Sequence, residues 1–229
     1  ADSRQVYRGM DIGTGKDLGD YKVNGLKIPY HLIDIVDAGS EYNVYEYQKD
    51  FAEAYRKVCH AGHIPVMCGG SGLYIESVLR NYRMLEVPSN PELRALLDEL
   101  DNERLEARLR SYGPIHNITD TVSRKRMIRA IEIAEFHKRE EELPSKDLDI
   151  HSLVVGITFD RESRRRRITK RLTHRLNQGM IQEVEQLLAS GVDHAKLQYY
   201  GLEYKFISLY ILGELSRDHM IDKLNTAIH

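Results

Sequence analysis

The stretch HIPVMCGGSGLYIESVLRN, residues 63–81, holds in one short run the elements that decide the fold. Its apolar first half ends in two glycines at 69 and 70, which is typical of a buried strand and the turn after it. Apolar residues at helical spacing follow over 71–81. Ligands of parallel sheets bind at the carboxyl ends of strands, so we expect a binding site at residues 69–72.

Strands and helices alternate on both sides of this stretch. HLIDIVD (31–37) predicts a short buried strand, and VYEYQKDFAEAYRKVCHAG (44–62) predicts an amphipathic helix that stops at Gly62. HSLVVGITFD (151–160) predicts another strand. This alternation is typical of a parallel sheet with helices on its faces, so we expect an α/β fold.

Two charged helical regions depart from the alternation. Residues 88–142 show no strand pattern and begin a helix at Asn90 and Pro91, a cap followed by a first-turn proline. Residues 161–229 predict two helices that each close with a glycine, then two more helices. We therefore predict a core of 1–84 and 146–229 that is interrupted by a helical insertion at 85–145.

The composition is that of a folded protein without a general preference for nucleic acid. The 229 residues are 41% hydrophobic and 30% charged, and the net charge of −2 provides no global basic field. No apolar run has the length of a membrane span, so no membrane partner is expected. Two cysteines, Cys59 and Cys68, cannot build a disulfide framework; we expect buried thiols in a reducing cytoplasm.

Two glycine-rich segments are candidates for anion binding. GTGKD (13–17) fails the Walker A pattern, because Met10 stands where a glycine is needed and Asp17 follows the lysine, so we interpret it as a loop that needs glycine geometry. GGSG at 69–72 can present backbone N–H groups and Ser71 to a ligand, although tight packing of the turn explains it equally well.

Arginine clusters and one aspartate add to this chemistry. Arg164, Arg167, Arg171 and Arg175 share one predicted helix face, and a second cluster covers 124–129. A solvated face is the simpler interpretation, but arginine suits bidentate phosphate contacts and favours an anion-binding surface. Asp2 faces the same cleft as Ser71 if a strand precedes it, where its carboxylate can accept a proton, or it serves as a cap or a metal ligand.

Five stretches together resemble the tRNA dimethylallyltransferase family: DSRQVYRGMDIGTGK, PYHLIDI, IPVMCGGSGLYIESVL, SRKRMIRAIEIAE and YGLEYKFISLYILGELS. The resemblance implies a P-loop-NTPase-like α/β parallel-sheet core and a helical insertion that binds the tRNA anticodon stem-loop. It implies transfer of a dimethylallyl group from dimethylallyl diphosphate to N6 of the adenosine 3′ of the anticodon, in tRNAs that read codons beginning with U. It also implies Mg²⁺, a monomer and a cytoplasmic enzyme.

The resemblance assigns roles to particular residues. Asp2 matches the general base, and Arg171 matches an arginine that holds the donor diphosphate. The residues it assigns to tRNA contact are Ser3, Arg4, Gln5, Ser71, Arg94, Lys125, Arg126, Met127, Ile128, Arg129, Tyr200, Gly201, Tyr204 and Lys205. Ser71 stands where many members have threonine, and Glu203 where others have glycine. No metal ligand is assigned within the chain.

Family members carry a Walker A-like loop before the segment that matches Asp2 and a basic tail beyond the segment that ends at His229. We expect the chain without that loop to be inactive. Two alternatives remain: an adenylate isopentenyltransferase that acts on a free adenine nucleotide, and an RNA-binding fragment without turnover. The basic cluster at Lys125–Arg129 favours RNA, since a free nucleotide needs no second basic surface.

Overall fold

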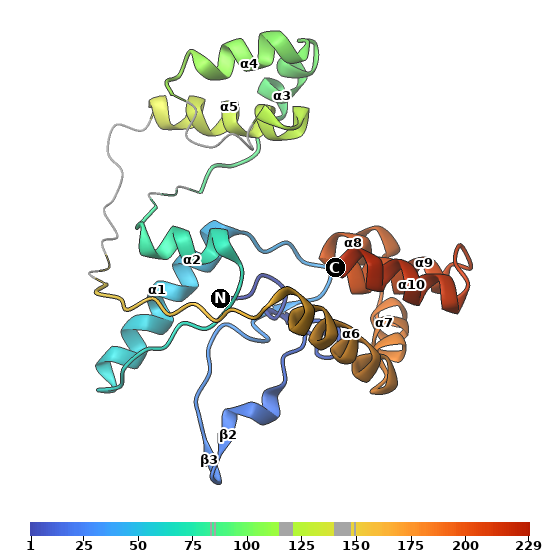
Figure 1. Cartoon of the computed structure of the whole chain (residues 1–229). Coiled ribbons are helices and arrows are strands. Elements are labelled where there is room, and N and C mark those ends of the chain that lie inside the picture. The colour runs from blue at the N-terminus through green and yellow to red at the C-terminus, as the bar shows by residue number, and fades with distance from the viewer. Residues whose placement is uncertain (83, 85, 115–120, 140–147, 149) are drawn as a thin grey trace. The chain divides into compact units, whose positions relative to one another are not determined.

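The computed structural model describes all residues except 83, 85, 115–120, 140–147 and 149. The chain divides into a core unit, Ala1–Asn81 with Leu148–His229, and an insertion unit, Tyr82–Asp147. The sequence predicts the division at 84/85 and 145/146, and residues 85, 145 and 146 lie outside the described residues. Figure 1 shows both units, and each is described here by itself.

The described sheet structure of the core unit consists of short pairs. Strands β1 (Tyr7–Arg8) and β4 (Val36–Asp37) pair in parallel, with Tyr7 opposite Val36. Strands β2 (Lys22–Val23) and β3 (Leu26–Lys27) form an antiparallel hairpin after the short 3₁₀ helix η1 (Leu18–Tyr21). Asn24 and Gly25 both have positive φ, as a two-residue hairpin turn requires.

Three strand predictions need correction. Only Val36–Asp37 of the run 31–37 is a strand, because Leu32 and Asp34 have positive φ. Residues 63–70 and 151–160 form no ladder with any described residue, and their apolar side chains are exposed, Ile64 to 89% and Leu153 to 91%. A strand depends on a neighbour that supplies its hydrogen bonds, so apolar periodicity alone does not create one. Cys59 and Cys68, predicted to be buried, are likewise exposed.

Helices α1 (Val44–His60) and α2 (Gly72–Leu79) follow the predicted positions closely. The Asn43 side chain accepts hydrogen bonds at the start of α1, and the Glu46 carboxylate accepts one from the Asn43 backbone N–H, which completes a capping box. Tyr47 of α1 stacks on Tyr74 of α2 at 4.3 Å between ring centroids. This contact fixes α2, and with it the glycine turn before it, against α1.

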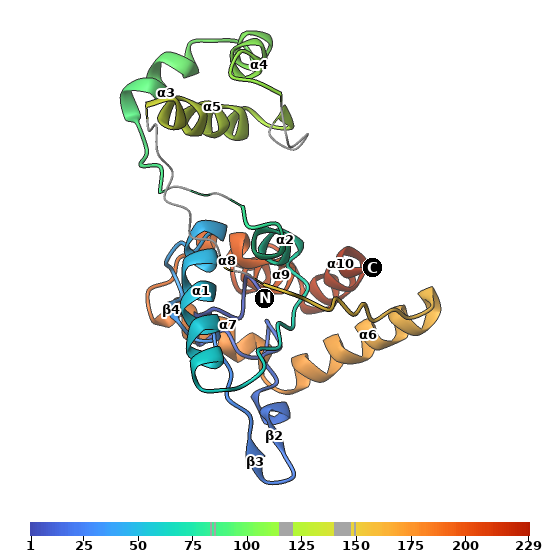
Figure 2. The ribbon, with the colours of Figure 1, turned by 90° about the vertical axis from the view of Figure 1, so that its left-hand side faces the viewer.

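The second half of the core unit is a set of packed helices. Their bounds are α6 (Arg161–Asn177), α7 (Met180–Ala189), α8 (His194–Tyr200), α9 (Leu202–Ile211) and α10 (Arg217–Ile228). Helix α9 contacts α7, α8 and α10, and α6 contacts α7 and α10 (Figure 2). Three helices follow α7 where the sequence predicted two, because Gly201 divides the region between α8 and α9.

The core of this unit joins the N-terminal segment to the C-terminal helices. Val6, Tyr7 and Met10 are completely buried and belong to the same apolar cluster as residues of α7, α8 and α9. The Tyr7 ring lies 4.5 Å from the Tyr200 ring. The first residues of the chain are thereby anchored beside α8 and α9, although nearly two hundred positions separate them in sequence.

The insertion unit contains three described helices, α3 (Pro91–Asp98), α4 (Asn102–Arg110) and α5 (Arg124–Arg139). The side chains of Asn90 and Asp101 cap α3 and α4, and Asn90 with Pro91 confirms the predicted helix start. The unit has its own core, formed by Leu97, Leu105, Leu109, Met127, Ile128 and Ile131. It is therefore a separately packed helical unit.

Candidate active site

A cleft of about 370 Å³ in the core unit collects residues from distant parts of the chain. Its size lies within the roughly 300–1,000 Å³ typical of small-molecule sites. The lining residues are, in chain order, Asp2, Arg4, Gln5, Gly13, Thr14, Gly15, Asp17, Arg171, Arg175, Tyr200, Gly201, Glu203 and Tyr204. We call it the Asp2 cleft. The two residues predicted to be catalytic, Asp2 and Arg171, line it together.

Asp2 forms a tight turn at the start of the chain. Its Oδ1 atom accepts hydrogen bonds from the backbone N–H groups of Arg4 (2.7 Å) and Gln5 (3.1 Å). Ser71 Oγ accepts a hydrogen bond of 2.9 Å from the N–H of Ser3, which ties this turn to the glycine turn before α2. Ser71 therefore lies beside the turn that Asp2 forms, but residues 69–72 are not among the residues that line the Asp2 cleft. A carboxylate held by two N–H donors has a defined direction.

Arg4 and Gln5, predicted to contact RNA, also brace the walls of the cleft. The Arg4 guanidinium donates to the Tyr199 carbonyl at 3.1 Å and lies 5.1 Å from the centroid of the Tyr199 ring. The Gln5 amide donates to the Gly15 carbonyl at 2.9 Å. Both side chains are half-buried and lie at the cleft, where a ligand can reach them.

The glycine loop at 13–17 has the special geometry that its sequence predicts. Gly15 has φ of +64°, and a Cβ atom there would lie only 1.6 Å from Nη2 of Arg175. A Cβ atom at Gly13 would lie 2.6 Å from the Tyr204 ring. No other residue fits these two positions without displacing a neighbour, so glycine lets the loop approach α6 and α9 closely.

A buried glutamate of α7 holds this loop in place. Glu183 Oε2 accepts hydrogen bonds from the N–H groups of Asp11 (2.7 Å) and Ile12 (2.6 Å), and its Oε1 accepts from Gly13 N–H at 3.0 Å. The Tyr204 hydroxyl donates to the same Oε1 at 2.7 Å. Burial and the adjacent carboxylate raise the pKa of Tyr204 well above its usual value, so the phenol stays a donor.

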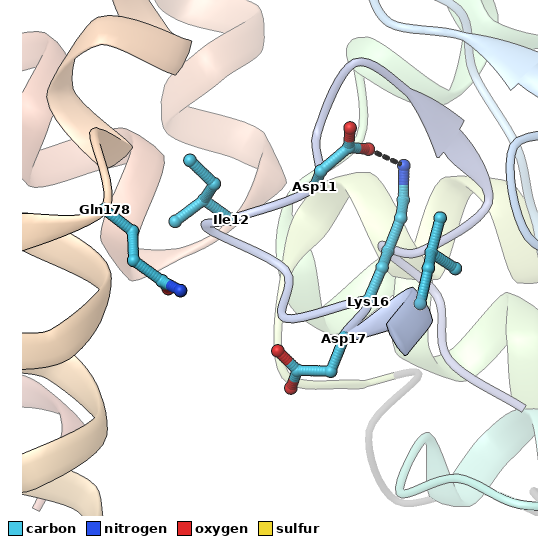
Figure 3. A pocket seen from close by; sticks show the side chains of 6 residues that line it. Asp11, Ile12, Lys16, Asp17 and Gln178 are labelled. Carbon is cyan, nitrogen blue, oxygen red and sulfur yellow. Dashed lines mark hydrogen bonds and ion pairs between the residues drawn. The ribbon is translucent and has the colours of Figure 1, made fainter. Parts of the chain in front are cut away.

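Lys16 is a structural cation and not a phosphate ligand. Its ammonium is buried and donates to the Tyr7 carbonyl at 2.7 Å, to Asp11 at 2.6 Å and to Asp34. Figure 3 shows the Lys16 side chain directed toward Asp11, and it shows Ile12 next to Gln178, which follows the last residue of α6. All three donor directions of the ammonium are used, which supports the interpretation that this loop is not a Walker A loop.

Helix α6 supplies two arginines to the Asp2 cleft, Arg171 and Arg175, one turn apart on the same face. Arg171 is exposed at the cleft and Arg175 is only 9% exposed. Asp160 caps the first turn of the helix, its side chain accepting from the N–H of Ser163. The helix therefore projects both cations rigidly toward the glycine loop and Asp2.

Two of the predicted tRNA contacts, Tyr200 and Tyr204, line the cleft although their side chains are almost wholly buried. Tyr200 and Tyr204 are 1% and 2% exposed, respectively. The Tyr200 hydroxyl accepts from the Gly39 N–H and donates to the Ser40 carbonyl, and the Tyr204 hydroxyl donates to Glu183, so both hydroxyls have partners within the unit. Gly201 lines the cleft and Lys205 is exposed, as a contact role requires.

The insertion unit likewise separates the predicted RNA contacts into two groups. Lys125 and Arg126 are exposed on α5. Met127 and Ile128 are 3% and 8% exposed and their side chains belong to the apolar core, and their predicted place in an RNA-contacting segment stays a prediction. An α-helix completes a turn every 3.6 residues, so a motif of five consecutive residues covers both the exposed and the buried side of α5.

Arg94 and Arg129 converge on one buried carboxylate. Arg94 makes two hydrogen bonds to Glu132, of 2.8 and 2.7 Å, and Arg129 makes one of 2.9 Å. Burial raises the pKa of Glu132, but the bonds from Arg94, the Asn90 N–H and Arg129 outweigh it and hold the pKa at about 2. Arg94 thereby connects α3 to α5, whereas Arg129 pairs with Glu132 within α5 and donates to the Val87 carbonyl at 2.8 Å. Both arginines stay predicted RNA contacts.

The family model of the IPP transferases matches residues 5–229. The chain belongs to the IPP transferase family. Two curated relatives in this family are 54% identical to the chain: tRNA dimethylallyltransferase 2 of Bacteroides fragilis over 233 residues, and tRNA dimethylallyltransferase 1 of Parabacteroides distasonis over 229. Each match covers 100% of the chain and 75% of the relative.

Solved structures of IPP transferases support the same placement. A tRNA isopentenylpyrophosphate transferase from Bacillus halodurans is 27% identical and aligns with a TM-score of 0.64. The match covers 99% of this chain and 72% of the Bacillus chain. A second structure, from Staphylococcus epidermidis, is 29% identical and aligns with a TM-score of 0.62. That match covers 99% of this chain and 75% of the Staphylococcus chain. The predicted fold class, an α/β core with a helical insertion, is confirmed.

The structure adds residues that the sequence analysis of this IPP transferase missed. Glu183 and the partners of Lys16 were not predicted, and Arg175 appeared only as one member of an arginine face. A signal for Glu183 was present, because it is a carboxylate inside the apolar stripe of Met180, Val184 and Leu187. A charged residue on a buried face is normally there to satisfy other polar groups.

Neither a cluster of metal ligands nor a membrane-spanning helix occurs in the part of the chain that the structure describes. No three His, Cys, Asp or Glu side chains come together there to hold a metal ion. The described helices include none that is long and apolar enough to span a membrane. Asp2, Asp17 and Glu203 do contribute carboxylates to the Asp2 cleft, without forming such a group.

Proposed function

We propose that the chain transfers a dimethylallyl group from dimethylallyl diphosphate to N6 of the adenosine 3′ of the anticodon, in tRNAs that read codons beginning with U. The observation that carries the proposal is the Asp2 cleft, where a fixed carboxylate and two arginines line one space of ligand size. A base and a diphosphate-binding cation are the groups that this reaction needs. The names of relatives at 54% identity support the same reaction.

The chemistry explains why these groups belong together. The adenine N6 lone pair is delocalised into the ring and is a poor nucleophile, whereas an allylic diphosphate ionises readily. The bond from the allylic carbon to the diphosphate oxygen breaks, a bond from that carbon to N6 forms, and the amine loses a proton. Asp2 takes the proton through Oδ2, since its Oδ1 is held by Arg4 and Gln5.

Arg171 stabilises the charge that develops on the leaving diphosphate. A guanidinium presents paired donors to phosphate oxygens, and its exposed position at the cleft leaves them available to a ligand. Mg²⁺ fits the same place, because it is commonly held by one or two carboxylates together with substrate phosphates, and Asp17 and Glu203 are within the cleft. When bound, the ion supplies further neutralisation of the leaving group.

The insertion unit binds the anticodon stem-loop through the exposed side chains of Lys125 and Arg126. Phosphate contacts of this kind position an RNA without reading its sequence. The target base must leave its stack to reach the Asp2 cleft, as in other enzymes that modify a base. We infer further that the protein works as a monomer in the cytoplasm.

The experiment offers the intact gene product three acceptors: an anticodon stem-loop with adenosine at the target position, the same stem-loop with inosine there, and free AMP. Dimethylallyl diphosphate and Mg²⁺ are supplied, and prenylated product is measured by mass. We expect product only with the first acceptor, since inosine lacks the N6 amine. Prenylated AMP would support the adenylate isopentenyltransferase instead, and stem-loop binding without product would leave an RNA-binding protein.

A further inference from the structure

Arg175 is a buried cation whose surroundings leave most of its donors unused. Its side chain lies at the bottom of the Asp2 cleft, and the residue is only 9% exposed. Its guanidinium donates one long hydrogen bond, of 3.4 Å, from Nη1 to the Gly13 carbonyl. Among the described residues, no carboxylate lies within the 4.0 Å of an ion pair with it. A guanidinium has five N–H donors, so the local structure satisfies few of them.

Such an arrangement is costly unless something else completes it. An unpaired charge taken out of water loses several kcal/mol of solvation. Burial lowers the pKa of the Arg175 guanidinium and the like charge of Arg171 lowers it further, while Asp17 and Glu203 act in the opposite direction. Two arginines one helical turn apart repel each other, and an anion bound between them would offset this repulsion.

The glycine loop is shaped around this side chain. Gly15, with positive φ, leaves the space that the Arg175 guanidinium fills. Gly13 supplies the carbonyl that contacts it, and the Gly13 N–H is fixed by Glu183. A loop that is held by a buried carboxylate and contains glycine at both contact points keeps the guanidinium directed into the cleft. A side chain needed only for packing would not require this support.

We propose that Arg175 and Arg171 together form a phosphate-binding pair in the Asp2 cleft, with Arg175 as its buried member. The proposal rests on the proposed function and deepens it, because it names a second residue that binds phosphate oxygens. Those oxygens belong either to the donor diphosphate or to a backbone phosphate of the flipped nucleotide. The chemistry of recognition is the same in both cases, so the experiment separates the two sources.

The test uses three variants of the intact gene product. Arg175→Met keeps length and removes the charge, and Arg175→Lys keeps a charge without the planar fork. Arg161→Met removes an arginine from the exposed start of the same helix, about 21 Å away along its axis, and serves as the control. Binding of inorganic diphosphate with Mg²⁺ is measured by calorimetry, binding of the stem-loop by a salt titration, and thermal stability without ligand.

We expect Arg175→Met to fold with unchanged or higher thermal stability, because replacing an unpaired buried charge by an apolar side chain of similar length is neutral or favourable. Its diphosphate affinity should fall about 10- to 100-fold, as loss of charge-assisted hydrogen bonds implies. Arg175→Lys should show a smaller loss, and Arg161→Met none. If Arg175 instead binds an RNA phosphate, Arg175→Met should keep the wild-type affinity for diphosphate. The slope of log affinity against log salt for stem-loop binding should then fall by about 0.7–0.9.

A loss of stability in Arg175→Met with both affinities unchanged would overturn the inference and make Arg175 a packing residue. The proposed function is judged separately by the wild-type protein. If the wild type prenylates the stem-loop and Arg175→Met binds both ligands normally, the inference fails and the function stands. If the wild type binds diphosphate through Arg175 but transfers no prenyl group, the function fails and the phosphate-binding pair stands.

Discussion

Removing the charge of Glu183 tests whether α7 holds the glycine loop in its active shape. The carboxylate accepts four hydrogen bonds, from the N–H groups of Asp11, Ile12 and Gly13 and from the Tyr204 hydroxyl. In Glu183→Gln, the amide oxygen can keep the bonds to Asp11 and Ile12 while the new NH₂ group donates to Tyr204. The Gly13 N–H then faces a donor and is left without an acceptor.

The magnitude follows from that count. A buried donor without an acceptor lowers the free energy of unfolding by about 1–3 kcal/mol, and hydrogen bonds to a charged acceptor stabilise more than bonds to a neutral one. We therefore expect Glu183→Gln to lower the free energy of unfolding by about 3 kcal/mol. For a protein of this length, each kcal/mol corresponds to about 2–4 °C, which gives a fall in Tm of about 6–12 °C. Prenyl transfer should fall as well, because Gly13 and Gly15 line the Asp2 cleft.

The assay is calorimetric unfolding together with single-turnover prenyl transfer. Glu185→Gln is the matched control, since Glu185 is an exposed residue of the same helix and the substitution removes the same charge. We expect the control to unfold within about 1 °C of the wild type, as exposed substitutions usually do. A Glu183→Gln protein with the stability and transfer rate of the control would refute the view that this carboxylate organises the loop.

Two further predictions concern the insertion unit. Replacing Lys125 and Arg126 together by alanine should lower the slope of log affinity against log salt for stem-loop binding by about 0.7–0.9 per lost phosphate contact. The control, Lys49→Ala with Arg56→Ala on α1, should leave this slope unchanged. Equal slopes for the two double variants would argue against α5 as an RNA surface. Glu132 has a pKa of about 2 against an ordinary value of 4.5. This difference means that the ionised carboxylate stabilises the folded unit by about 3 kcal/mol above pH 5. The contribution is lost as the pH falls from about 5 to 2. Unfolding measured from pH 7 to pH 2 should show that loss in the wild type and not in Glu132→Gln, and identical pH profiles would contradict it.

The helices could be predicted from the sequence because their signals are local. Asn43 with Glu46, and Asn90 with Pro91, lie beside the turns that they start. The strands at 63–70 and 151–160 were predicted wrongly, because a strand needs a partner that local periodicity does not specify. The same limit applies to the short pairing of β1 with β4, which joins segments almost thirty positions apart.

The candidate site could be predicted only in part, for a related reason. The family resemblance selected Asp2 and Arg171, and the structure places them in one cleft. It also selected Tyr200 and Met127, and a motif alone could not show that their side chains are buried. Burial depends on packing between distant segments, and so does the set of bonds to Glu183.

The role of Asp2 as the base that accepts the N6 proton is the central claim, and Asp2→Asn tests it most directly. The amide oxygen of asparagine can still accept from the Arg4 and Gln5 N–H groups, so the turn keeps its shape while the proton acceptor is lost. Single-turnover prenyl transfer to the stem-loop should fall by about 10²–10⁴, with stem-loop affinity within a few fold of the wild type. Asp222→Asn, at an exposed position of α10, should transfer at the wild-type rate. Near wild-type transfer by Asp2→Asn would contradict the assignment and remove Asp2 from the chemistry.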